Sequence, residues 1–138
     1  MNTDTLVNQG DGSGKDRSGL QCELTDRVIG AAFTVSNAMG CGFLEKVYEN
    51  ALAIELTSRG MDVKGQRGIE IRYRDQLVGF YVADLIVEER VIVEVKALDG
   101  LDRAHYGQCI NYLKATGLRV CLLLNFGRPR LEVKRLAL

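Results

Sequence analysis

Three charged side chains lie within an otherwise apolar stretch, Leu77–Ala97, and their types suit metal-assisted chemistry. Asp84 interrupts the first of two β-type apolar runs, and Glu94 and Lys96 interrupt the second. Strand side chains alternate between faces, so Glu94 and Lys96 share one face while the intervening valines fill the other. The pattern therefore predicts an acid and a base side by side on one strand.

The turn between the two runs decides which residues face each other. We expect residues 88–90 to form a three-residue hairpin loop, which pairs Val87 with Val91. The same register places Asp84 opposite Glu94, with their Cβ atoms roughly 5 Å apart. Two carboxylates that close repel each other and lose hydration on burial, and a divalent cation between them removes the conflict. Mg²⁺ suits the pair because it binds one or two carboxylates and otherwise keeps water or phosphate oxygens.

The alternative is a structural ion pair at the end of the sheet. Lys96 could neutralise either Glu94 or Asp84 without any metal. The convergence of three charges on one face favours the metal site over that alternative.

The N-terminal part of the chain supplies little that can be buried. Residues 1–19 are rich in Gly, Asn, Asp, Ser and Thr, which predicts a disordered tail ahead of one domain at 20–138. Apolar residues at helical spacing predict a first helix from about Leu20, which Thr25 can cap and which ends near Met39. At 138 residues, the chain is long enough for a single domain with a sizeable core.

Periodicity also predicts the elements around the central stretch. Two further helices are expected at 44–59 and 102–116, the first of them with Val47, Ala51 and Ile54 along one side. Besides the two central runs, strands are predicted at 63–73, 120–125 and 131–136. The last helix joins the hairpin to the buried run 120–125, which favours a crossover with parallel pairing. The fold class is therefore α/β, a mixed central sheet flanked by helices with the last strand at one edge.

Composition narrows the compartment and the partners. Lys plus Arg and Asp plus Glu balance at 18 each, so no global positive field indicates nucleic acid, and any such binding must be local. The four cysteines are scattered without a CxxC pair, which predicts free and mostly buried thiols in a reducing compartment. No basic leader and no run of about 20 apolar residues is visible, so we expect a cytoplasmic protein with no membrane partner.

Taken from Leu44 onward, the predicted order α-β-β-β-α-β resembles the restriction-endonuclease-like core of the PD-(D/E)XK nuclease superfamily. Asp84 with Glu94-Val95-Lys96 resembles its signature, although Ala83 stands where the superfamily's name has proline. The segment Gly42-Phe43-Leu44-Glu45-Lys46-Val47-Tyr48 resembles the GxxExxY pattern that names one branch of that superfamily. The phrases VIVEVKA, YLKATGL and LNFG resemble the same branch.

The resemblance implies roles for individual residues. The metal ligands would be Asp84, Glu94, the backbone carbonyl of Val95 and, from the preceding helix, Glu45. Lys96 would orient the attacking water or stabilise phosphoryl charge, and Gln108 would help to position the substrate or Lys96. The candidate pocket walls are Tyr48, His105 and Tyr112. Each of these has a structural alternative. Tyr48 at helical spacing is also typical of a core residue, and His105 is equally typical of an exposed helix residue.

The function implied is a Mg- or Mn-dependent nuclease that hydrolyses phosphodiester bonds in DNA or RNA through Asp84, Glu94 and Lys96. One alternative is a catalytically silent nucleic-acid-binding or protein-interaction module with the same fold, and another is a metal-stabilised structural subunit. The 15.3 kDa chain has little room for a separate DNA-reading domain. An active enzyme would therefore need a homodimer or an unknown protein partner to hold its substrate.

Overall fold

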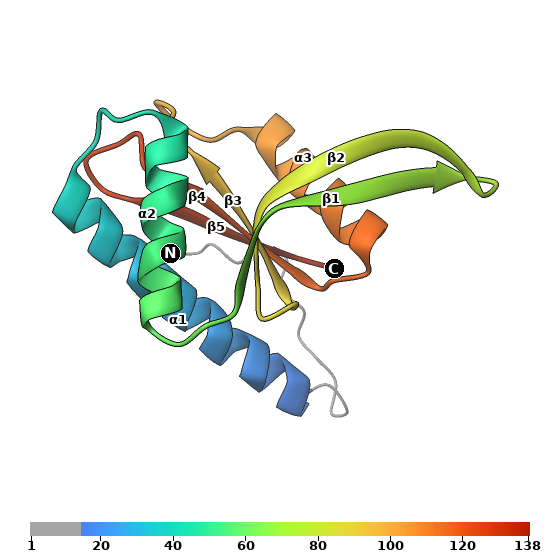
Figure 1. Ribbon diagram of the computed structural model, residues 1–138, viewed down its shortest axis with the longest axis horizontal. Helices are drawn as coiled ribbons and strands as arrows, with labels where there is room; N and C mark the ends of the chain where they lie inside the picture. Colours follow the sequence, from blue (N-terminus) through green and yellow to red (C-terminus); the bar gives the residue numbers. More distant parts are fainter. Residues whose placement is uncertain (1–14) are drawn as a thin grey trace.

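The structure is a computed structural model that describes residues 15–138, with side chains from residue 22 onward (Figure 1). Its elements are α1 (Lys15–Met39), α2 (Glu45–Ser58), β1 (Val63–Tyr73), β2 (Gln76–Val87), β3 (Val91–Lys96), α3 (Arg103–Thr116), β4 (Val120–Asn125) and β5 (Glu132–Ala137). The predicted order of helices and strands is confirmed, and so is the α/β fold class.

The five strands form one sheet in the order β1-β2-β3-β4-β5. Strands β3 and β4 are parallel and the other neighbours are antiparallel, so the sheet is mixed, as the sequence predicts. The parallel pair follows from the crossover through α3, because a chain that leaves one strand and enters a parallel neighbour must return along the sheet. Strand β5 lies at one edge and β1 at the other.

Helices cover both faces of the sheet (Figure 1). α1 and α2 pack on one face over a core that includes Val93 and Val95, while α3 packs on the other face over Ile92. This split follows directly from the period-two alternation along β3. The central strand is therefore buried on both sides, and its two charged residues interrupt the face covered by α3.

The hairpin between β2 and β3 has the predicted register, with Val87 paired to Val91. Glu88 and Glu89 both have positive φ, and the Arg90 N–H donates to the Val87 carbonyl over 3.0 Å. Two consecutive positive φ values are what a type I′ turn requires, and that turn matches the twist of the flanking strands. The turn thus sets the register that carries Asp84 to Glu94.

Strands β1 and β2 extend beyond the body of the molecule as a two-stranded ribbon (Figure 1). The ribbon turns at Arg74 and Asp75, which have φ values of 51° and 65°. A register shift between Ile71 and Arg72 introduces an irregularity near the tip. We refer below to residues 67–83 as the β1–β2 ribbon.

Helix α1 differs from the prediction at its start. Its backbone is helical from Lys15, so residues 15–19 belong to the helix and not to a tail; the rest of the predicted tail, residues 1–14, lies outside the described residues. Thr25 is a buried residue within the helix, where its hydroxyl donates to the Cys22 carbonyl over 3.0 Å. The prediction that Thr25 caps this helix was therefore wrong.

The buried face of α2 also differs from the prediction. Ile54, expected on the apolar side, is 71% exposed, and the helix buries Tyr48, Glu49, Leu52 and Leu56 instead. The two polar residues of this face can be buried because the Tyr48 hydroxyl and the Glu49 carboxylate both have hydrogen-bond partners.

The cysteines bear out part of their prediction. All four are free, but only Cys109 and Cys121 are buried, whereas Cys22 and Cys41 are exposed. None of the described helices is long and apolar enough to cross a membrane.

Asn125, at the end of β4, ties together the loops beside the end of β3. Its fully buried side-chain oxygen accepts from the N–H groups of Leu98 (2.8 Å) and Gly127 (3.0 Å). Its amide nitrogen donates to the Leu98 carbonyl and to Glu132 Oε1, each over 3.0 Å. Gly127 packs so tightly here that a Cβ atom on it would lie 2.3 Å from the backbone nitrogen and oxygen of Leu98.

Replacing Gly127 with alanine should destabilise the fold. The added methyl group meets backbone that cannot move aside without breaking the Asn125 hydrogen bonds, so we expect a loss of about 3 kcal/mol in the free energy of unfolding. Urea denaturation of the variant measures this loss. Gly107→Ala in α3 is the matched control, because a Cβ there meets no atom within 4 Å, and it should add about 0.5–1 kcal/mol. Equal stability for the two variants would contradict this account of Gly127.

Candidate metal centre and active site

Asp84 and Glu94 lie where strands β2 and β3 cease to pair through their backbones. The ladder runs from Val87–Val91 to Leu85–Val93, and the next step would bring Asp84 against Glu94. At that step the carboxylates replace the backbone carbonyls as acceptors. The Asp84 N–H donates to Glu94 Oε2 over 3.0 Å, and the Val95 N–H donates to Asp84 Oδ2 over 2.9 Å. Each carboxylate is therefore held by the backbone of the opposite strand.

Burial makes this carboxylate pair costly to ionise. Glu94 is only 3% exposed, and burial, followed by the negative charge of Asp84, raises its pKa to about 8. Burial is also the main cause of the raised pKa of Asp84. Both effects disfavour two negative charges at neutral pH, and a bound cation would reverse them.

The free oxygens of the pair suit a cation. Asp84 Oδ1 and Glu94 Oε1 accept no hydrogen bond from the described residues, because the backbone donors engage the other oxygen of each carboxylate. Among residues 22–138, no group of three or more His, Cys, Asp or Glu side chains is gathered closely enough to hold a metal. Two carboxylates with water or substrate oxygens match the preference of Mg²⁺ better than that of a metal bound only by protein.

Lys96 ends β3 beside the two carboxylates. It is half-buried, and its positive charge opposes the effect of burial on the pKa of both Asp84 and Glu94. The structure therefore brings together the three charges with which the sequence analysis began.

Helix α2 adds two further carboxylates near this pair. Glu45 is the first residue of the helix and is exposed. Glu49, one turn later, is 6% exposed and accepts hydrogen bonds from Lys46 Nζ (3.2 Å) and Gln66 Nε2 (2.6 Å). Burial has the largest effect on the pKa of Asp84 and raises it, and the hydrogen bond from the Val95 N–H has the next largest and lowers it. The negative charges of Glu49 and then Glu45 follow, and both raise this pKa.

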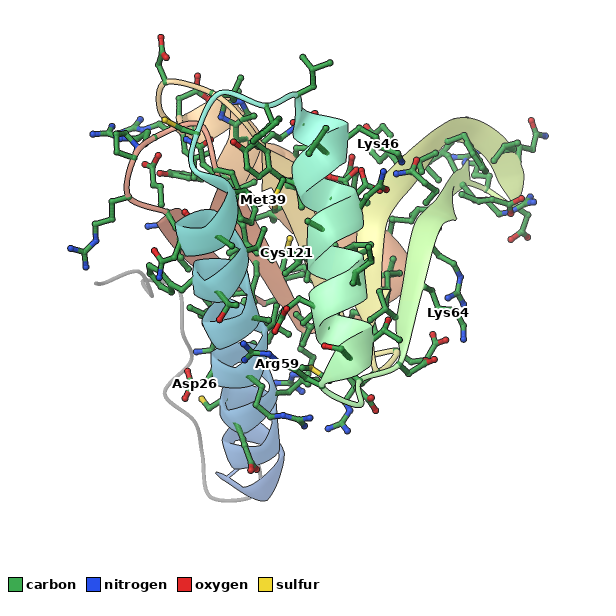
Figure 2. The ribbon with its side chains drawn as sticks, turned by 60° about the vertical axis from the view of Figure 1, so that its left-hand side comes forward. Asp26, Met39, Lys46, Arg59, Lys64 and Cys121 are labelled. Atoms are coloured by element: carbon green, nitrogen blue, oxygen red, sulfur yellow. The ribbon has the colours of Figure 1, made fainter. Side chains whose placement is uncertain are left out.

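Glu49 and Gln66 were not selected as site residues from the sequence. The signal for Glu49 was its position four residues after Glu45, on the same stripe of α2. Gln66 gave no signal, because it reaches Glu49 through a left-handed backbone conformation with φ of 49°. Lys46 projects from the first turn of α2 on the side that faces the β1–β2 ribbon (Figure 2).

The loop before α2 explains why Tyr48 is buried. Gly42 has φ of 114°, and the N-cap residue Leu44 provides no side-chain hydrogen bond. Tyr48 supplies the missing support, since its hydroxyl donates to the Gly40 carbonyl and accepts from the Phe43 N–H over 3.2 Å. The ring is fully buried and stacks on Phe126 with centroids 4.9 Å apart. Tyr48 therefore holds the loop that positions Glu45, and its burial does not support a role as a wall of the substrate pocket.

The candidates on α3 separate into two groups. His105 acts as a helix cap: its Nδ1 accepts from the Asp102 N–H over 3.0 Å. Burial and then the negative charges of Glu94 and Asp84 raise the pKa of Tyr112. Its ring also contacts Tyr81, with centroids 5.3 Å apart. Gln108 is half-buried one turn before Tyr112, and no described hydrogen bond joins it to the site.

A comparison with protein-family models decides the family. The model described as the PD-(D/E)XK nuclease superfamily matches residues 22–136, which is most of the chain. This chain belongs to the PD-(D/E)XK nuclease superfamily. Searches of curated proteins and of solved structures found no significant match. Membership suggests a metal-dependent nuclease, and the Asp84, Glu94 and Lys96 positions agree with the superfamily signature.

The metal-free protein should lose stability as the pH rises through the neutral range. The pKa of Glu94 is about 8 in the folded chain, against 4.5 for an exposed glutamate, so the folded state binds more protons between these values. The free energy of unfolding should therefore fall as the pH rises from about 4.5 to about 8, by at most about 1.4 kcal/mol per pH unit. Urea denaturation in a chelator across this range measures the slope. Glu94→Gln should flatten the profile, and a wild-type profile that is already flat would contradict the burial of this acid.

Proposed function

We propose that this chain is a divalent-metal-dependent nuclease that hydrolyses phosphodiester bonds in DNA or RNA. The observation that carries the proposal is the pair of cross-strand hydrogen bonds that the Asp84 and Glu94 carboxylates accept, which we call the carboxylate lock. Glu94 is buried and Asp84 is half-buried, both have raised pKa values, and Lys96 lies beside them. A purely structural pair would gain nothing from two acids that disfavour each other's ionisation. A site that binds a cation and a phosphate needs this combination.

The metal would be Mg²⁺ or Mn²⁺, held by Asp84 and Glu94 with the Val95 backbone carbonyl as a third ligand. Glu45, at the start of α2, would bind it through water, because among residues 22–138 no three acidic side chains lie closely enough to hold one ion directly. When bound, such a cation lowers the pKa of a coordinated water and stabilises the charge that develops on the scissile phosphate.

The chain's own residues would do the remaining work. Lys96 would donate to the attacking water or to a phosphate oxygen, as a compact cation at the end of a buried strand can. Glu49 would keep Lys46 and Gln66 in place beside the site, through the hydrogen bonds that it accepts from them. The Tyr112 ring would limit the access of water from the side of α3.

We also assign the chain to the GxxExxY branch of the superfamily. The support is structural, since Gly42, Glu45 and Tyr48 form one unit: a glycine with positive φ opens the helix, the acid starts it, and the tyrosine closes the loop. The motif would thus serve to place Glu45 at the metal.

Calorimetry with Mn²⁺ tests the metal assignment without requiring activity. The wild-type chain should bind the ion, and Asp84→Asn or Glu94→Gln should weaken binding at least about tenfold, because each removes a ligand charge. Glu55→Gln is the matched control, since Glu55 lies in the last turns of α2 and pairs with Arg59 over 2.8 Å. Equal binding by the wild type and Glu94→Gln would show that the ion binds elsewhere.

Cleavage assays test the reaction itself. With Mn²⁺ and single- or double-stranded DNA or RNA, the wild type should cleave, and Asp84→Ala and Lys96→Ala should each lower the rate at least about 100-fold. Lys64→Ala removes an exposed lysine that pairs with Asp62 and should leave the rate unchanged. Cleavage that survives Asp84→Ala would come from another site or a contaminant. Salt-dependent binding without any cleavage would instead indicate a silent nucleic-acid-binding module.

A further inference from the structure

Strands β1 and β2 both change the face that their side chains present partway along their length. On β2, Leu85 is buried in the core covered by α1 and α2, whereas Ala83, two residues away, is buried in the core covered by α3. On β1, Val63 packs against the first core and Ile69 belongs to the second. Residues an even number of positions apart share one face of a regular strand, so the alternation is broken on both strands. On β2 the break lies at Asp84.

Gln66 is the residue of β1 at which the backbone leaves the extended conformation. Its φ is 49°, and the other described non-glycine residues with positive φ lie in the two hairpin turns. The pairing of β1 with β2 is interrupted at one step, where Gln66 lies opposite Asp84. A left-handed residue within a strand bends it and increases its twist, which accounts for the change of face. Beyond this step the strands continue as the β1–β2 ribbon, which bends away from the rest of the sheet (Figure 1).

The side chain of Gln66 joins this break to α2. Its Nε2 donates to Glu49 Oε2 over 2.6 Å, and Glu49 is buried. Among residues 22–138, this is the only hydrogen bond between α2 and a strand. A hydrogen bond to a buried carboxylate is stronger than one between neutral groups. One residue of β1 therefore shapes the backbone opposite Asp84 and also ties down the helix that begins with Glu45.

We propose that Gln66 is a positioning residue, which holds the carboxylate lock and the start of α2 in place relative to each other. The inference rests on the proposed function, because it concerns the site that would bind the metal. Gln66 itself would bind neither metal nor substrate, and it would act through Asp84 on one side and Glu49 on the other. A left-handed conformation is unfavourable for a glutamine and persists only where its surroundings hold it, and such residues are concentrated at functional sites.

Amide hydrogen exchange in a chelator tests this role without metal or substrate. The Asp84 and Val95 N–H groups should be protected in the wild type, because both donate to the lock. Gln66→Gly should speed their exchange at least about tenfold, because the link to α2 is lost. Its melting temperature should stay close to that of the wild type, since glycine adopts the left-handed conformation freely. A merely structural role would lower the protection and the melting temperature together.

A charge swap provides the rescue. Gln66→Glu alone sets a second carboxylate against Glu49 and should also speed the exchange of the two lock amides at least about tenfold. The double variant Glu49→Gln/Gln66→Glu restores a donor and an acceptor with the same total charge. Its exchange rates should return to within about threefold of the wild type, because the two changes are coupled through one hydrogen bond.

Calorimetry extends the test to the metal. Gln66→Gly should weaken Mn²⁺ binding about tenfold, because the lock and the start of α2 are no longer held together. Asp75→Gly is the matched control, since Asp75 also has positive φ, at 65°, but lies in the turn at the tip of the ribbon. It should change neither the exchange of the lock amides nor the affinity for Mn²⁺.

Two results would overturn the proposal. One is unchanged exchange at Asp84 and Val95 in Gln66→Gly, and the other is equal exchange in Gln66→Glu and the double variant. A wild type that binds no Mn²⁺, with a lock that loosens in Gln66→Gly, would remove the metal assignment and still support the role of Gln66 in positioning the lock.

Discussion

The structure depends on one exchange of hydrogen bonds, in which Asp84 and Glu94 each accept from the backbone of the opposite strand. A regular ladder would continue past Leu85 and leave no room between β2 and β3. Once the carboxylates replace the backbone acceptors, the strands need not close, and the backbone donors orient one oxygen of each acid. Since a charge-assisted hydrogen bond to a backbone N–H is stronger than a neutral one, the lock offsets part of the cost of burying the acids.

Features at both ends of β3 keep this exchange in place. The tight turn at Glu88 and Glu89 sets the register at one end, although left-handed φ values for two non-glycine residues cost roughly 1–2 kcal/mol each. At the other end, Asn125 binds the loop that follows Lys96 through two hydrogen bonds with Leu98, and two more join it to Gly127 and Glu132. A catalytic pair requires positions that packing and hydrogen bonds fix from both sides, because small displacements of catalytic groups lower the reaction rate.

Much of this could be predicted from the sequence, since the register of a hairpin follows from the loop length and the alternation of side chains. Asp84, Glu94 and Lys96 could therefore be placed together before any coordinates. What could not be predicted depended on partners distant in sequence. Glu49 can be buried because Gln66, from strand β1, donates a hydrogen bond to its carboxylate. Ile54 is exposed because α2 buries the side that carries Tyr48 and Glu49 instead. Likewise, His105 caps its own helix through a local hydrogen bond that its spacing on a helical face does not reveal.

Strand β2 links the site to the ribbon, because Val82 on the exposed face is only two residues from Asp84. The strand is buried at its Asp84 end and exposed at its tip, so the least supported part of the sheet leads directly to the Asp84–Glu94 pair. Burial and the mutual repulsion of the two acids disfavour the ionised pair when no cation is present, and the backbone hydrogen bonds of the lock oppose that effect. The pair therefore gains from any contact that keeps β2 and β3 in register.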